Sequence, residues 1–294
     1  MNEYELVSDY RHNKVLREQF NELVKVTFGI DFSVWYEKGY WNETYIPYSF
    51  IDNGKVIANA SVYKMSVVIN DLSYDAIQIG TVMTDKLYRN KGLAKRLMDH
   101  IIEEYKGSCD FMYLFANESV LDFYPKLGFV RIDESEYRLN VNNSNTQRET
   151  SACPRKLSVE DDLAILERFA TNRLIGHTLD VKNNKELLMF YFVLVFSEAI
   201  YYIEELETIV LMEQDEDILH VYDLISLKEQ EMELILSHFC LDSTKSVVLH
   251  FTPEKQIVGM DVQVVPADDD ALFVIGNAPF LNNRHVKFPL TSHC

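Results

Sequence analysis

One stretch of the sequence combines residue types that could bind an anion. Residues 78–94 read QIGTVMTDKLYRNKGLA: an apolar run, then a basic turn containing Gly92, then the start of a helical pattern. The first turn of a helix leaves backbone N–H groups without intrahelical partners, and the helix dipole adds partial positive charge there. Four basic residues surround the glycine: Arg89, Lys91, Lys95 and Arg96. The pattern favours a phosphate site, although an ordinary strand-to-helix turn with a solvated basic face would have the same composition.

Motifs for several other kinds of site are missing. The sequence contains no G-x-x-x-x-G-K-[ST], no G-x-G-x-x-G and no G-x-S-x-G, which disfavours ATP and NAD sites and a serine nucleophile elbow. The four cysteines are scattered and the eight histidines have no paired spacing, so we expect neither a disulfide framework nor a metal site.

The elements around residues 78–94 read as a mixed α/β unit. We expect a helix over 13–27, a hairpin with strands 48–51 and 55–68, and a strand over 75–84. An amphipathic helix (93–105), a strand (111–116), a short helix (120–126) and a last strand (129–139) follow. Strands and helices in this order predict one sheet with helices packed on it.

Two motifs in register carry a family resemblance. Residues 88–94 (YRNKGLA) resemble the R/Q-x-x-G-x-G/A acetyl-CoA signature of the GCN5-related N-acetyltransferase (GNAT) superfamily, and residues 80–84 resemble its fourth strand. Downstream, Ala116-Asn117 and residues 122–129 (DFYPKLGF) are similar to that family's N…FYeklGF segment. The resemblance covers about residues 5–140 and implies a mixed, mostly antiparallel sheet flanked by helices.

The resemblance also implies a site for acetyl-CoA, with no metal. The fourth and fifth strands of the family splay apart, and the pantetheine arm lies between them. The positions that would bind the cofactor here are Val82, Met83, Thr84, Arg89, Asn90, Lys91, Gly92, Leu93, Ala94, Lys95 and Asn117.

Tyr124 matches the tyrosine that protonates the departing thiolate as general acid; the alternative is a core aromatic. The family's reaction is direct attack of a neutral amine on the thioester. Many members place a glutamate base on the fourth strand, where this chain has Gln78, and Asp75 and Glu118 are the nearby carboxylates. A water chain or a group from the second half of the chain is an equal alternative.

An aromatic cluster follows the first helix. Residues 28–48 hold eight aromatic residues, including both tryptophans of the chain. Because this segment borders the acceptor pocket in the family, we expect a substrate wall; the alternative is that these rings pack a long loop onto the sheet. The candidate substrate-binding residues are Phe28, Trp35, Tyr36 and Trp41.

The second half of the chain differs in charge. Residues 141–154 read as a linker between a GNAT domain (1–140) and a second domain (155–294). The first 140 residues carry 16 basic and 21 acidic groups (net −5), and the rest of the chain carries 12 and 25 (net −13). Its order of helices and strands repeats the first half, but its strand-to-helix junction, residues 225–233, has three glutamates and no glycine. We therefore expect a second, degenerate GNAT-like domain that does not bind the cofactor.

The last residue of the sequence carries one further hypothesis. One long-chain group of the superfamily, which resembles the enhanced-intracellular-survival acetyltransferases, uses its terminal carboxylate as base. Cys294 would be the analogous residue, although this chain is shorter and lacks a sterol-carrier-like third domain.

These observations predict an acetyl-CoA-dependent N-acetyltransferase that acts on a primary amine of a small molecule or peptide. The alternative is an acetyl-CoA-binding sensor without turnover, and the second domain could also be an oligomerisation module, so either a monomer or a homodimer is open. The net charge of −18 disfavours nucleic acid and is compatible with a cationic acceptor. No signal peptide or membrane-spanning segment is recognisable, so we expect a cytoplasmic protein without a membrane partner.

Overall fold

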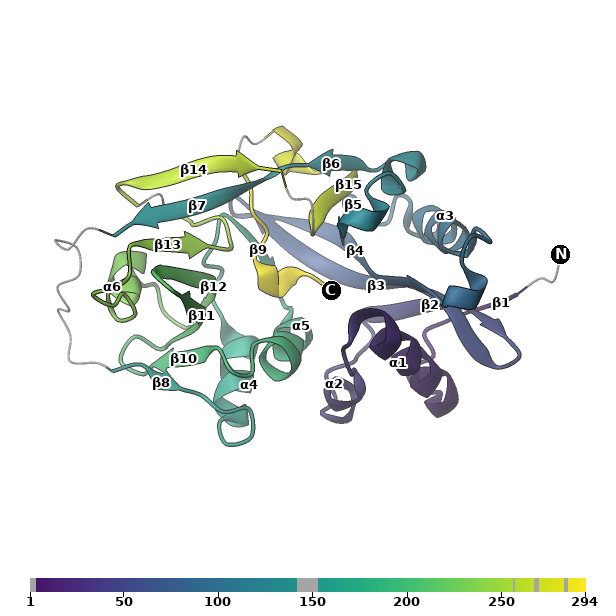
Figure 1. The fold of residues 1–294 in the computed structure, drawn as a ribbon, viewed down its shortest axis with the longest axis horizontal. Coiled ribbons are helices and arrows are strands. Elements are labelled where there is room, and N and C mark those ends of the chain that lie inside the picture. The colour runs from purple at the N-terminus through teal and green to yellow at the C-terminus, as the bar shows by residue number, and fades with distance from the viewer. Residues whose placement is uncertain (1–3, 142–152, 256, 267–269, 283–284) are drawn as a thin grey trace.

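A computed structural model describes residues 4–141, 153–255, 257–266, 270–282 and 285–294 of the chain. Two β-sheets lie side by side along the long axis, each with its own helices, and the last residue lies between them (Figure 1). The predicted linker, residues 141–154, falls almost wholly outside the described residues.

The first sheet is mostly antiparallel and contains the 78–94 segment. Its strands, in spatial order, are β1 (Glu5–Ser8), β2 (Tyr45–Asp52), β3 (Lys55–Ile69), β4 (Leu72–Thr84), β5 (Phe111–Ala116), β15 (Ala271–Gly276) and β6 (Val130–Ile132). A further strand, β9 (Leu179–Lys182), pairs with the far end of β3. The β2–β3 and β3–β4 hairpins turn through residue pairs with positive φ, Asn53-Gly54 and Asn70-Asp71, which suits the twist of antiparallel strands.

The second sheet repeats this layout. Its strands, in spatial order, are β8 (Arg155–Lys156), β10 (Ile200–Ile203), β11 (Thr208–Asp215), β12 (Ile218–Ser226), β13 (Ser246–Leu249), β7 (Glu134–Asn140) and β14 (Met260–Val265). In each sheet the fourth and fifth strands, β4–β5 and β12–β13, form the parallel pair. The expected GNAT-like second half is therefore present as a sheet of the same topology.

The two sheets exchange one strand with each other. The sixth strand of the first sheet, β15, comes from the second half of the sequence and pairs with β5 and β6. The sixth strand of the second sheet, β7, comes from the first half and pairs with β13 and β14. The predicted single strand over 129–139 is thus two strands that serve different sheets. A boundary at residue 140 assigns both exchanged strands to the wrong unit.

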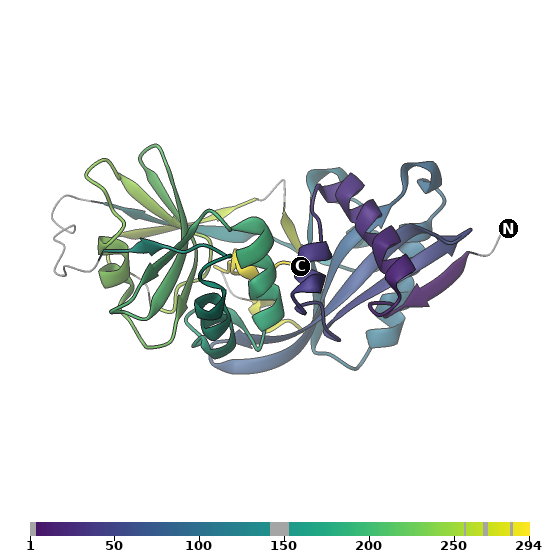
Figure 2. The same ribbon diagram turned by 90° about the horizontal axis from the view of Figure 1, so that it is seen from below.

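Helices cover both faces of the first sheet. Asn13 caps helix α1 (Lys14–Phe28), since its side chain accepts a hydrogen bond from the Leu16 N–H (3.2 Å). The apolar face of α1 packs on one side of the sheet, together with α2 (Ser33–Glu37). Helix α3 (Leu93–Tyr105) packs on the opposite side through its buried leucine, methionine and isoleucine residues. Figure 2 shows α1 in front of the sheet. Strand β4 thus lies between two helical layers.

Between the two sheets pack α4 (Leu163–Asn172), α5 (Lys185–Phe190) and a π-helical turn (Tyr191–Val195). Helix α6 (Met232–Ser237) packs instead on the far side of the second sheet. Side chains of α1, α4 and α5 belong to a single buried apolar cluster. The helix at the expected strand-to-helix junction, residues 225–233, is α6, which has six residues. Within the described part of the chain, no helix has both the length and the hydropathy to cross a membrane.

Candidate active site

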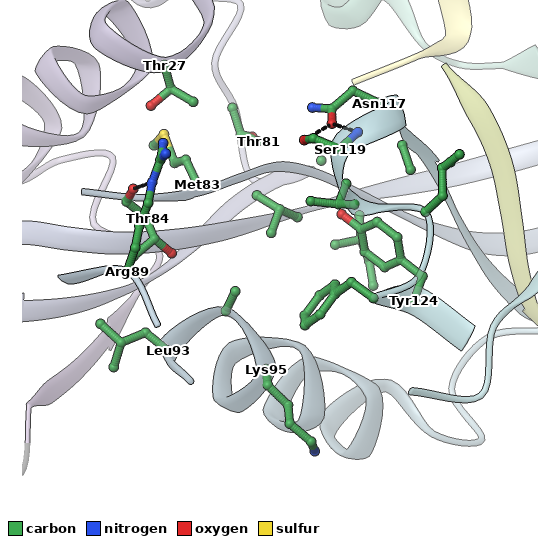
Figure 3. Close-up of a pocket in the computed structure, with 18 of the residues that line it drawn as sticks. Thr27, Thr81, Met83, Thr84, Arg89, Leu93, Lys95, Asn117, Ser119 and Tyr124 are labelled. Carbon is green, nitrogen blue, oxygen red and sulfur yellow. Dashed lines mark hydrogen bonds between the residues drawn. The ribbon is translucent and has the colours of Figure 1, made fainter. Parts of the chain in front are cut away.

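A large pocket opens where β4 and β5 diverge. The two strands pair in parallel only from Ala76–Phe111 to Gln78–Tyr113, although β4 continues to Thr84 and β5 to Ala116. The pocket between their separated ends has a volume of about 1110 Å³ (Figure 3). On this side of β4 the backbone groups beyond Gln78 have no strand partner among the described residues, so they are available to a ligand that lies along the strand.

A β-bulge in β4 shapes one wall of the pocket. Asn59 of β3 lies opposite Met83 and Ser61 lies opposite Gly80, so two residues of β4, Thr81 and Val82, face one residue of β3. Thr81 has a φ of +46°, which is rare for a β-branched residue and costs on the order of 1–3 kcal/mol. The bulge bends β4 away from β5 and directs the chain from Val82 onward along the pocket.

Buried polar side chains hold this strained residue in place. The amide of Asn59 is fully buried and donates to the Thr81 carbonyl (3.0 Å), and the Tyr45 hydroxyl lies 2.5 Å from the Thr81 Oγ1. The Asn59 Oδ1 in turn accepts a hydrogen bond from Ser49 (2.8 Å), which is bonded to the Tyr10 hydroxyl (2.6 Å). Because each of these groups is satisfied inside the core, the network offsets the backbone strain.

A concave backbone segment lies at the open end of the pocket. It runs from Asn90 into the first turn of α3, and we call it the glycine cradle. Asn90 and Gly92 have left-handed φ values of +62° and +75°, and Gly92 is the N-cap of α3 without a side-chain capping bond. The N–H groups of the first helical turn therefore have no intrahelical partners and face an anion-binding concavity. This agrees with the geometry expected from the sequence.

The basic side chains contribute less directly. Lys95 is paired with Asp99 (2.6 Å) and points away from the pocket in Figure 3, and the Lys91 ammonium lies over the Tyr88 ring (4.4 Å). Arg89 lies beside the pocket, with its Nε donating to the Thr84 carbonyl (3.3 Å). The backbone N–H groups are thus the main anion-binding feature.

The predicted cofactor-binding residues gather in one place. Of that set, the structure leaves only Lys91 outside the pocket wall. The residues that line it are Val82, Met83, Thr84, Arg89, Asn90, Gly92, Leu93, Ala94, Lys95 and Asn117. The Asn117 side chain accepts hydrogen bonds from the backbone N–H and the hydroxyl of Ser119 (3.1 and 2.6 Å), which fixes the turn after β5.

Tyr124 lies on the wall opposite the bulge. Its ring packs against Phe123, Phe129 and, from the exchanged strand β15, Phe273, and its hydroxyl points into the pocket (Figure 3). The structure shows no hydrogen-bond partner for this hydroxyl among the described residues. Burial raises the pKa of Tyr124 to about 12, so the hydroxyl stays protonated at neutral pH.

Carboxylates are scarce at this pocket. Among the described lining residues, Glu118 and Asp122 carry side-chain carboxylates, and both are exposed. Asp75 lies where β4 and β5 are still close together, and its backbone is hydrogen-bonded to Asp110. Gln78 is buried outside the pocket wall, and its Oε1 has no partner among the described residues.

Cys294 forms part of the pocket wall. A Cβ built on Gly80 would lie 2.2 Å from the carbonyl oxygen and 2.8 Å from the Sγ of Cys294, so the last residue packs directly on the bulged strand. Burial raises the pKa of the Cys294 thiol well above its ordinary value, so it stays a neutral thiol. The hypothesis that Cys294 serves the reaction requires this residue to be in the pocket, and it is there; its role as base stays a prediction.

The aromatic cluster is only in small part at the pocket. Phe28 lines the pocket, whereas Trp35 and Trp41 are buried in the core and Tyr36 borders a separate small cavity under the Arg17 guanidinium. The Trp35 Nε1 donates to the Glu186 carbonyl (2.8 Å) at the start of α5. The expected substrate wall is corrected accordingly: of the four candidates only Phe28 lines the pocket, and Trp35 instead contacts the second half of the chain through Glu186 and Phe190.

The corresponding gap in the second sheet is closed by the chain itself. β12 and β13 pair in parallel only from Ile218–Ser246 to Val221–Leu249, and β12 continues to Ser226. The segment 174–178 lies between the diverging ends, since the Leu174 N–H bonds to Ser226 and the Thr178 N–H bonds to Thr252. We call the space between the diverging ends of β12 and β13, which this segment fills, the closed slot. An acidic start of α6, at Glu231 and Glu233, replaces the glycine cradle.

Comparisons with known proteins agree with this geometry. Residues 13–132 match the model of an acetyltransferase (GNAT) domain. No match is found among curated proteins.

Solved structures match nearly the whole chain. A probable N-acyltransferase from Enterococcus faecalis superposes with a TM-score of 0.64 at 15% identity, covering 95% of this chain and 75% of its own. A GCN5-related N-acetyltransferase from Kribbella flavida gives 0.54 at 15% identity, covering 94% and 73%. Eis1 from Mycobacterium abscessus gives 0.51 at 14% identity, covering 78% and 63%. At these identities the likeness shows a common fold. The family match identifies residues 13–132 of this chain as an acetyltransferase (GNAT) domain, and the diverging strands and the glycine cradle agree with it.

Proposed function

We propose that the protein transfers an acetyl group from acetyl-CoA directly to a primary amine of a small molecule or peptide. The observation that supports this proposal most strongly is the continuous pocket that joins the cradle at Gly92, the unpaired edge of β4 and the hydroxyl of Tyr124. A pyrophosphate, an extended amide-containing arm and a thioester need these three features in this order.

The pocket fits the donor along its length. The N–H groups of the first turn of α3 would hold the pyrophosphate, and the free backbone of Val82, Met83 and Thr84 would bond the pantetheine amides. A backbone N–H at the bulge is fixed before substrate binds, so it can polarise the thioester carbonyl without reorganisation. When bound, acetyl-CoA supplies the activated acetyl group.

Tyr124 serves the departing sulfur mainly as a hydrogen-bond donor. Its pKa is about 12, and an ordinary thiol has a pKa of about 8.5, so complete proton transfer to the thiolate is uphill by roughly 3.5 pKa units, or about 5 kcal/mol. A charge-assisted hydrogen bond stabilises the developing thiolate without this cost.

The attacking amine must lose a proton. An alkylamine with a pKa near 10.4 is less than about 1% neutral at pH 7 to 8. The buried amide of Gln78 cannot accept a proton, and the carboxylates of Glu118 and Asp122 are exposed at the rim of the pocket. We propose that water in the pocket takes the proton, so that the reaction draws on the neutral fraction of the amine.

A thiol-release assay with a panel of small amines, polyamines and peptide N-termini tests this proposal. We expect stoichiometric CoA release and acetylated product for at least one amine class. Tight binding of acetyl-CoA without turnover on any amine would instead support the alternative, an acetyl-CoA sensor. No binding of acetyl-CoA at all would contradict both.

A further inference from the structure

A short segment at the end of the chain connects the pocket to the closed slot. We call residues 289–294 the strap. Thr291, which is fully buried, donates a hydrogen bond to the Asp223 carboxylate of β12 inside the closed slot. Cys294 packs on Gly80 in the wall of the pocket. Three residues of extended chain span at most about 10 Å, so little slack separates the anchor from the pocket.

The anchor is a buried ionic cluster centred on Asp223, both of whose carboxylate oxygens are hydrogen-bonded. Asp223 is completely buried and also accepts hydrogen bonds from the His177 Nε2 (2.7 Å) and the Arg173 Nη1 (3.3 Å). Arg173 bonds both carboxylate oxygens of Asp180 (2.9 and 3.0 Å). A buried charge that loses one of its partners is strongly disfavoured, so this cluster accepts few alternative arrangements.

The strap is also fixed between its two ends. The Tyr191 hydroxyl donates to the His293 carbonyl (2.7 Å), and the His293 ring stacks on Phe115 of β5 with ring centres 3.4 Å apart. Phe115 itself lines the pocket. The strap therefore contacts both of the diverging strands, through Gly80 on β4 and Phe115 on β5.

We propose that the second half of the chain is a positioning device for the first: its closed slot holds the strap so that Cys294 completes the wall of the acetyl-transfer pocket. Asp223 and Thr291 are positioning residues, since they act through the strap and do not touch the pocket. The proposal rests on the proposed function for its effect on turnover, and on the structure alone for the placement of Cys294. It also explains why a slot that no longer accepts a cofactor keeps a buried, charged interior.

The test replaces Thr291 by Val, which keeps the shape of the side chain and removes its hydroxyl. Thr291→Ser, which keeps the hydroxyl, is the rescue variant. Thr208→Val is the matched control, because Thr208 is equally buried in the second sheet and its hydroxyl bonds Leu206 and Ser226 without touching the strap.

Two quantities are measured in the full-length chain. The first is the rate at which iodoacetamide alkylates Cys294, followed by peptide mass spectrometry with Cys240 as internal reference. The second is kcat for acetyl transfer together with KM for acetyl-CoA. For Thr291→Val we expect at least tenfold faster alkylation of Cys294, at least tenfold lower kcat and a KM within twofold of wild type. Thr291→Ser should stay within threefold of wild type in all three values.

The two arms separate the possible failures. Equal alkylation of Cys294 in Thr291→Val and Thr208→Val would overturn the anchoring of the strap. Faster alkylation with an unchanged kcat would overturn its role in the reaction. If the wild-type chain acetylates no amine, the proposed function fails, and the alkylation rates still decide whether the closed slot holds Cys294 in the pocket.

Discussion

The contact between Gly80 and Cys294 allows a test by a single methyl group. In Gly80→Ala the new Cβ would lie 2.2 Å from the carbonyl oxygen, 2.7 Å from the carbonyl carbon and 2.8 Å from the Sγ of Cys294. Ordinary contacts begin near 3.4 Å, so Cys294 must move by about 1.2 Å. Two of the three atoms belong to the backbone, so a change of side-chain rotamer cannot relieve the overlap.

This displacement should affect catalysis more than stability. Overpacking of this kind costs typically 1–3 kcal/mol of folding free energy. A misplacement of about 1 Å at a reacting site can lower the rate by about 100-fold. We therefore expect a fall in kcat of about 10- to 100-fold, with an acetyl-CoA dissociation constant within about threefold of wild type, because the cradle at Gly92 is unchanged.

The measurements are kcat by thiol release, acetyl-CoA affinity by calorimetry, and the alkylation rate of Cys294. Thr208→Val is again the control, since Thr208 is buried in the second sheet and its hydroxyl does not touch the strap. If Gly80→Ala matches this control in kcat and in Cys294 alkylation, the strap does not pack on β4 in solution. If acetyl-CoA affinity collapses while Cys294 stays protected, the methyl group acts on the cofactor and the reasoning is refuted.

Three further outcomes follow from the pocket. Tyr124→Phe should lower kcat about 10- to 150-fold, the equivalent of a charge-assisted hydrogen bond of about 1.5–3 kcal/mol, at unchanged acetyl-CoA affinity; wild-type turnover would exclude Tyr124 from the reaction. The kcat/KM for the amine should rise close to tenfold per pH unit from pH 7 to 9, because the neutral fraction of the amine rises. It should not fall by pH 10, because the raised pKa of Tyr124, about 12, keeps its hydroxyl protonated. A plateau from pH 7 would reveal a protein base. Gly92→Ala should weaken acetyl-CoA binding about tenfold, whereas Gly107→Ala, with a similar φ (+79° against +75°) at the other end of α3, should lose similar stability and no affinity.

The pocket could be predicted from sequence because its signals are local. The apolar run, the basic turn and the helix start lie within residues 78–94, and the backbone geometry of Gly92 depends on its immediate neighbours. Tyr124 could be placed because residues 122–129 keep a fixed distance from that segment. Short-range patterns of this kind determine strand, turn and helix with little help from the rest of the fold.

The aromatic cluster could not be interpreted from sequence in the same way. Trp35 and Tyr40 are fixed by hydrogen bonds to Glu186 and Glu167, more than 120 residues further along the chain. Aromatic composition is the same for a substrate wall and for a helix interface, and only the position of α4 and α5 distinguishes them. The Thr81 bulge was equally hidden, because it depends on the pairing of β4 with Asn59 on β3.

The strand exchange shows where a sequence-based domain boundary fails, and it makes a last prediction. A fragment of residues 1–140 contains the whole family match yet lacks β15, whose Leu272, Phe273 and Val274 are almost completely buried in the first sheet. At about 1.5–3 kcal/mol for each such side chain, their loss removes roughly 5–9 kcal/mol, a large part of the 5–15 kcal/mol that stabilises a typical domain. Phe273 also packs on Tyr124, so the pocket wall that carries Tyr124 depends on the exchanged strand.

We therefore expect the 1–140 fragment to lack a cooperative unfolding transition and to bind no acetyl-CoA, and co-expression with residues 141–294 to restore both. In the fragment, β7 is the strand able to take the place of β15, but its sequence, ESEYRLN, offers fewer large apolar residues than ALFVIG. A monomeric fragment that unfolds cooperatively and binds acetyl-CoA with wild-type affinity would show that β7 does replace β15. In that case the exchange would be a consequence of joining two complete domains and not a requirement for folding the first.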